Sequence, residues 1–153
     1  MAISYIKGRG FMREAFYDNQ YRTTVICIDT YEDGVLDGRM YNPYLDAGIS
    51  FHSTMEFLKK LDYMLVKMNL PQSFSANKVF RPVQEVELGA PPQDTLQKGK
   101  AATFAVNILF RQNASWQGLV TWSEGQREES FRSVLELLLM MDSVLEKPTR
   151  EGR

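Results

Sequence analysis

The sequence predicts an α+β fold in which a strand–strand–helix unit occurs twice. Thr23 to Leu65 aligns without a gap onto Thr103 to Leu145, at an offset of 80 residues, with ten identities in 43 positions. Composition alone would give roughly two or three identities. Each copy opens with β-branched runs and closes with a helical pattern. Two such units favour one antiparallel sheet with both helices packed on one face, related by a pseudo-twofold axis, and a partly closed barrel is the competing arrangement. The identical pairs are Thr23/Thr103, Ile28/Ile108, Gly38/Gly118, Ser50/Ser130, Phe51/Phe131, Ser53/Ser133, Glu56/Glu136, Leu58/Leu138, Asp62/Asp142 and Leu65/Leu145.

The first copy spans residues 23–68 and is expected to read strand, turn, strand, helix. We predict strands over Thr23 to Tyr31 and Leu36 to Tyr41, because these runs are rich in β-branched and aromatic residues and are separated by an Asp-Gly turn signal. Residues 42–48 are predicted to be loop. The helix is predicted from about Ser53 to Met68, where Asn69 and Pro71 end the pattern.

The second copy spans residues 103–146 and is expected to repeat this order. Strands are predicted over Thr103 to Arg111 and Trp116 to Trp122, with turns at residues 112–115 and 123–126, and a helix from about Ser133 to Glu146. The two helix starts, Ser-x-x-Glu in both copies, are capping boxes, so we assign these Ser and Glu side chains to helix capping rather than to catalysis. The repeated Asp62 and Asp142 sit beside the polar faces and are expected to pair with a nearby strand or loop.

A connector of residues 69–102 joins the copies, and the whole of residues 1–153 is predicted to be a single domain. Val79 to Val86 is a possible edge strand that Pro82 interrupts. Gly89 to Lys100 has the composition of a flexible linker. Ile3 to Lys7 is predicted to form a short strand, and residues 147–153 a disordered tail.

Composition excludes several classes of function. The net charge of −1 gives no basic excess for nucleic-acid binding, so no nucleic-acid partner is expected. The longest apolar run, Leu137 to Met141, is too short to span a membrane, and no signal-peptide core begins the sequence. We therefore expect a cytoplasmic protein without a membrane partner.

The single cysteine and single histidine exclude an internal disulfide and a Cys/His zinc site, so no metal is expected. Cys27 lies in a predicted strand and is interpreted as a buried thiol, and the second copy has Asn107 at this position. No nucleotide-binding loop or hydrolase motif is present, so we expect no cofactor and no enzymatic activity. The least favoured alternative is a small enzyme with a carboxylate-based site in the cleft between the copies.

The outward faces of the two predicted helices differ in polarity. The first carries Glu56, Lys59 and Lys60, whereas the second carries Glu136, Leu139 and Met140, with Leu135 at its edge. Full burial of each such apolar side chain is worth ~1.5–3 kcal/mol, so the second face should be covered. We expect a second copy of the chain to cover it in a homodimer, or another protein to bind there. The alternative is that the connector or the N-terminal segment folds over it.

The second copy also has an unusual hairpin. Trp116 and Trp122 are an even number of residues apart on one strand and so face the same side. With Arg111, Asn113 and Ser115 nearby they would form a surface for a ligand of unknown identity or a peptide. The alternative is that both tryptophans cap the end of the core.

Asn113-Ala-Ser115-Trp-Gln-Gly118 and the pair Arg9 and Arg13 are two short half-motifs of the sequence. The first is similar to one half of the signature of the PilZ family, which binds cyclic di-GMP, and the second is similar to its arginine half. The resemblance implies a nucleotide-sensing module that uses Arg9, Arg13, Asn113 and Ser115. The two halves lie much further apart here than in that family.

Four segments, residues 109–118, 130–137, 22–29 and 53–57, carry a resemblance that covers most of the chain. Through them the chain resembles a group of small uncharacterised proteins from gut clostridia, and this resemblance carries over no functional residue. The sequence therefore leads to the expectation of a non-enzymatic cytoplasmic binding or adaptor module that acts through protein–protein contacts.

Overall fold

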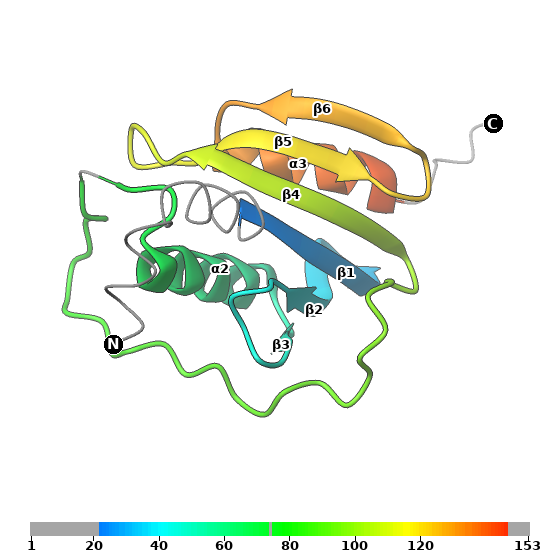
Figure 1. Ribbon diagram of the computed structural model, residues 1–153, viewed down its shortest axis with the longest axis horizontal. Coiled ribbons are helices and arrows are strands. Elements are labelled where there is room, and N and C mark those ends of the chain that lie inside the picture. Colours follow the sequence, from blue (N-terminus) through cyan, green and yellow to red (C-terminus); the bar gives the residue numbers. More distant parts are fainter. Residues whose placement is uncertain (1–21, 74, 147–153) are drawn as a thin grey trace, which may run out of the picture.

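In the part of the chain that the structure describes, six strands form one antiparallel sheet, and two helices pack against one of its faces (Figure 1). The computed structural model describes residues 22–73 and 75–146. The strand order is β3-β2-β1-β4-β5-β6, which confirms the α+β class with an antiparallel sheet. The first half contains β1 (Thr23–Glu32), β2 (Val35–Tyr41), β3 (Ile49–Phe51) and α2 (Thr54–Met68), and the second half contains β4 (Ala102–Phe110), β5 (Gln117–Trp122), β6 (Arg127–Phe131) and α3 (Val134–Leu145).

Each half has three strands, so the prediction of two strands per unit is wrong. The third strand of the first half, β3, has only three residues, which is too short to show a period of two. The third strand of the second half, β6, reads Arg-Glu-Glu-Ser-Phe and has little intrinsic strand propensity, but it pairs with β5 along its whole length. The predicted edge strand at Val79 to Val86 is also wrong, since that exposed segment joins no ladder in the described sheet.

The two halves share the same strand registers at the 80-residue offset. Val25 pairs with Ala105, its own counterpart, so the pseudo-twofold axis passes between these two residues. A bulge follows Ile28 in β1 and Ile108 in β4, at the same place in each half. Gly38 and Gly118 lie opposite these positions, and a Cβ there would come within 2.0 Å of a carbonyl oxygen of the neighbouring strand, so only glycine fits at either place.

The caps of both helices follow the predicted pattern. The Ser53 hydroxyl accepts the N–H of Glu56 at 3.0 Å, and the Ser133 hydroxyl accepts the N–H of Glu136 at 3.1 Å. Each glutamate also accepts the N–H of the residue before the cap, at His52 and Arg132. Helix α2 ends at Asn69 in the left-handed region, where its N–H bonds back to the last turn.

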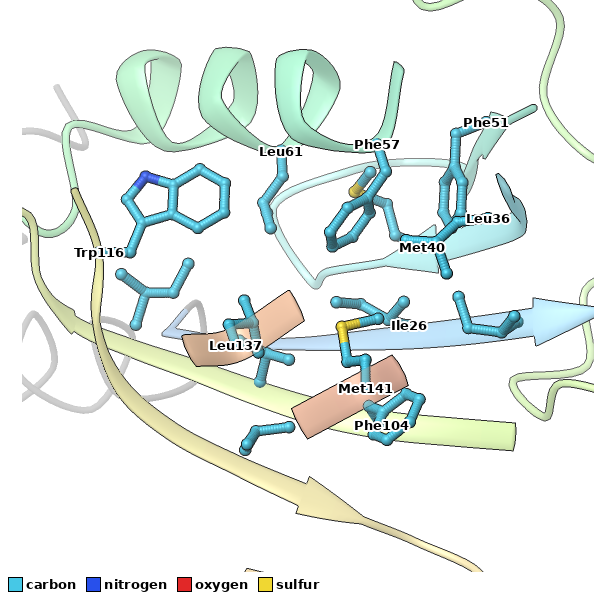
Figure 2. Packing of buried hydrophobic residues seen from close by; sticks show 14 of the residues in the cluster. Ile26, Leu36, Met40, Phe51, Phe57, Leu61, Phe104, Trp116, Leu137 and Met141 are labelled. Carbon is cyan, nitrogen blue, oxygen red and sulfur yellow. The ribbon is translucent and has the colours of Figure 1, made fainter. Parts of the chain in front are cut away.

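One apolar core lies between the helices and the sheet (Figure 2). Alternate residues of the central strands, such as Ile26 and Phe104, point into it beneath both helices. Phe51 of β3 and Phe57 of α2 have ring centroids 5.1 Å apart. The core joins both halves, because α2 and α3 each contribute fully buried side chains. The largest of these fully buried helix side chains are Phe57, Leu61, Met64, Leu137 and Met141.

The connector runs from α2 to β4 outside the first half (Figure 1). Its residues 85–88 contact α2, and its residues 94–98 lie against the opposite face of the sheet. Arg39 lies next to the inward-facing Met40 and therefore points to this opposite side. Its buried guanidinium forms an ion pair with Asp29 at 3.0 Å and donates to the carbonyls of Leu96 at 2.7 Å and Lys98 at 2.9 Å. Arg39 thus holds this part of the connector to the sheet together with Tyr41, whose hydroxyl donates to the carbonyl of Asp94 at 2.7 Å.

Cys27 is fully buried beneath this connector, and burial raises the pKa of its thiol to about 11. Because the thiolate is the reactive form, we expect a chromogenic disulfide reagent at pH 8 to leave the native protein unlabelled. The same reagent should titrate one thiol per chain once the protein is unfolded. Rapid labelling of the native protein would show that the connector opens easily.

Candidate functional site

The apolar face predicted on the second helix is partly exposed. Leu135 is 64% exposed and Leu139 is 55% exposed, so these two residues lie on the outer surface of α3 as expected. Met140 instead packs against the core, and its counterpart Lys60 is buried, so placing these two on the outer face was wrong. The third strand of each half widens the surface that the helix covers. In the first half, Lys60 donates to the carbonyl of Ser50 in β3 at 2.8 Å.

The two tryptophans of the predicted hairpin surface both lie against the core. Trp116 is 5% exposed and points toward α2 (Figure 2). Trp122 is partly buried, and the following turn packs on its ring, since a Cβ at Gly125 would come within 2.1 Å of it. This placement corresponds to the alternative in which the tryptophans cap the core.

The polar residues of that hairpin have structural partners. Asn113 occupies the turn with φ of 58°, and the Ser115 hydroxyl accepts the N–H of Val134 at 2.9 Å, at the first turn of α3. Arg9 and Arg13 lie outside the described residues. The similarity to cyclic di-GMP-binding domains therefore stays a prediction.

A cleft of about 540 Å³ lies between the two halves. Helix α2 contributes Lys59 and Asp62 to its wall, and the segment after β4 contributes Arg111 and Trp116. Ser115 also lines it, so three of the five residues predicted for the hairpin surface meet here with the repeated Asp62. The remaining lining residues are Leu58, Val66, Asn69, Ser73, Ser75, Ala76, Asn77, Ala114 and Val134.

Arg111 and Asp62 place opposite charges in this cleft without touching each other. Arg111 is 9% exposed, and its Nε donates to the carbonyl of Pro71 at 2.8 Å. Burial lowers the pKa of Arg111 and raises the pKa of Asp62, while the charge of each group opposes the shift of the other. Within the described residues, no ion pair joins the two side chains. No hydrogen bond from these residues reaches the Asp62 carboxylate.

A smaller hollow of about 320 Å³ occupies the pseudo-symmetric place on the other side of the axis. Tyr31 and Asp142 lie there at the positions that correspond to Arg111 and Asp62. The Tyr31 hydroxyl donates directly to Asp142, and this hydrogen bond raises the pKa of Tyr31 to about 12. The fold therefore builds the same helix-to-strand site twice, closed by a hydrogen bond on one side and open on the other.

This arrangement accounts for the repeated aspartates, whose role the sequence left undecided. Each helix reaches across the pseudo-twofold axis to the end of the first strand of the other half. Sequence reasoning placed Arg111 in a candidate site but did not connect it to Asp62. The sequence does contain evidence for this connection, because the 80-residue offset aligns Tyr31 with Arg111 and Asp62 with Asp142.

The fold and this cleft define an α+β domain of two pseudo-symmetric β-β-β-α halves with a polar cleft between them. No family model, curated protein or solved structure matches the chain. In residues 22–73 and 75–146, no helix is long and apolar enough to cross a membrane. The same residues contain no group of three or more His, Cys, Asp or Glu side chains that could hold a metal ion.

Proposed function

We propose that this protein is a non-enzymatic cytoplasmic binding module that acts through protein–protein contacts, with a second copy of the chain as its partner. The observation that carries the proposal is the exposure of Leu135 and Leu139 on α3. These residues are four positions apart, so they are neighbours on one face of the helix. An apolar strip of this kind is stabilised when another surface removes it from water.

The polarity of the two helices supports this choice of surface. The position in α2 that corresponds to Leu139 is Lys59, an exposed lysine, so the fold itself does not require an apolar residue there. Arg39 holds residues 96 and 98 of the connector on the opposite face of the sheet, and Leu135 and Leu139 of α3 stay more than half exposed. A twofold dimer that packs α3 against α3 of the partner would bury the same two leucines on both sides.

The carboxylates also support a non-enzymatic role. Asp29 pairs with Arg39, Glu124 accepts the N–H of Thr103, Glu136 caps α3 and Asp142 accepts from Tyr31. These groups hold the fold together rather than facing a substrate. Asp62 is the half-buried carboxylate that has no such bond among the described residues.

Exchanging Leu135 and Leu139 together for lysine is expected to convert a dimer into a monomer. Four charged side chains would face one another in the interface, and like charges brought together oppose association. The measurement is solution mass by light scattering over a concentration series. Met55→Lys, which changes the counterpart of Leu135 on α2, is the matched control and should leave the mass unchanged. A wild-type protein that stays monomeric throughout, or a double variant that stays dimeric, would contradict the proposal.

A further inference from the structure

We propose that the cleft between α2 and the segment after β4 is a binding site for a small zwitterion of the α-amino acid class, with its carboxylate on Arg111 and its ammonium on Asp62. This site is separate from the α3 surface, so the inference does not depend on the proposed dimer.

Arg111 has the features of a preorganised carboxylate-binding group. Its side chain is buried in the wall of the cleft, and the bond from Nε to the carbonyl of Pro71 fixes one edge of the guanidinium. The two terminal nitrogens have no described hydrogen-bond partner. A carboxylate matches such a fork with two parallel hydrogen bonds, which are stronger and more directional than those of a single ammonium.

Asp62 supplies the complementary charge on the facing wall. Its half-buried carboxylate accepts no hydrogen bond from the described residues, and burial raises its pKa because the ionised form lacks solvation. The ammonium group of a bound ligand would donate hydrogen bonds to the carboxylate and so replace the lost water. A ligand with both charges would satisfy Arg111 and Asp62 together without adding net charge to the cleft, whereas a simple anion or a simple cation would satisfy only one of them.

The pseudo-symmetric hollow shows why only one of the two sites is open. There, the neutral hydroxyl of Tyr31 already satisfies Asp142, so neither group is left for a ligand. In the open cleft, Leu58, Val66 and Trp116 add apolar wall beside the charged pair, which suits a ligand with an apolar side chain. The volume of about 540 Å³ is within the ~300–1,000 Å³ typical of small-molecule sites.

Thermal unfolding with and without each standard L-α-amino acid tests this site in the full-length protein. We expect at least one amino acid with an apolar side chain to raise the melting temperature by about 5–10 °C at a hundredfold excess over its dissociation constant. The matching compounds without the amino group or without the carboxylate should give at most a tenth of the affinity, since each leaves one buried charge unpaired. Calorimetric titration of the best amino acid gives the dissociation constant for each variant.

Two matched variants distinguish the cleft from any other site. Asp62→Asn keeps the size of the side chain and removes the charge, and it should weaken binding at least tenfold without lowering the melting temperature of the free protein. Asp142→Asn makes the same change in the closed hollow and should leave the affinity unchanged. The inference is overturned if no amino acid stabilises the wild-type protein, if both variants weaken binding equally, or if guanine nucleotides stabilise it and amino acids do not. A failed dimer test would leave these results unaffected.

Discussion

Replacing Arg39 by methionine is expected to lower the free energy of unfolding by about 3–5 kcal/mol, because it removes one partner of a buried ion pair. Asp29 would remain partly buried without its guanidinium, and the carbonyls of Leu96 and Lys98 would lose their donors. The connector would then be held to the sheet mainly by the bond from the Tyr41 hydroxyl to the carbonyl of Asp94 and by the bonds at Gly99, Lys100 and Ala101. Chemical denaturation monitored by circular dichroism measures the change.

The control for this variant is Arg127→Met, because Arg127 forms an ion pair with Glu129 in which both side chains are well exposed. Such a pair contributes at most about 1 kcal/mol, so equal losses from the two variants would contradict the role of Arg39.

The pH dependence of stability gives a second readout for Arg39→Met. Burial alone would raise the pKa of Asp29, but hydrogen bonds from Arg39 and from the N–H of Lys100 hold it below its usual value. This stabilisation is present above the ordinary pKa of an unfolded aspartate, ~3.9, and is lost as the pH falls through the lower folded pKa. The difference between wild type and Arg39→Met should shrink over that acid range.

Leu137→Ala is expected to cost about 2–5 kcal/mol, because Leu137 is fully buried in the core that joins the two halves. The cost includes the lost apolar burial and the cavity that remains between α3 and the sheet. The measurement is the denaturant concentration at the midpoint of unfolding, which should fall while the slope of the unfolding free energy against denaturant concentration stays unchanged. Met55→Ala, at an exposed position of α2, should change stability by no more than about 0.5 kcal/mol. A small effect of Leu137→Ala would mean that the second half contributes little to a common core.

The elements with local signals could be predicted from the sequence. Propensity and turn chemistry correctly placed the capping boxes at Ser53 and Ser133, the end of the first helix near Asn69 and the first two strands of each half. The strands β3 and β6 could not be predicted in this way. Their pairing depends on a neighbouring strand rather than on their own residues, since one is three residues long and the other has four polar residues in a row.

That omission also explains the errors in the predicted surfaces. A helical wheel places Lys60 and Met140 away from the apolar arc, but the extra strand of each half widens the buried face to include them. The sequence analysis placed a cleft between the copies but did not bring Asp62 and Arg111 together in it, for a related reason. Asp62 and Arg111 belong to different halves, and only the pairing of Val25 with Ala105 brings the end of β4 opposite α2. No feature within one copy of the repeat carries that information.

The two outermost strands limit how the sheet can meet other sheets. An exposed edge offers unpaired N–H and C=O groups, and it is the usual starting point of strand addition and fibril growth. Here β3 ends the sheet after only three residues, and β6 ends it with Arg127, Glu128 and Glu129 exposed in succession. Growth from the first edge would gain few hydrogen bonds, and growth from the second would require three consecutive exposed charged side chains of each strand to pack beside another strand. The protein can therefore keep an apolar helix surface in water and still resist ordered aggregation through its sheet.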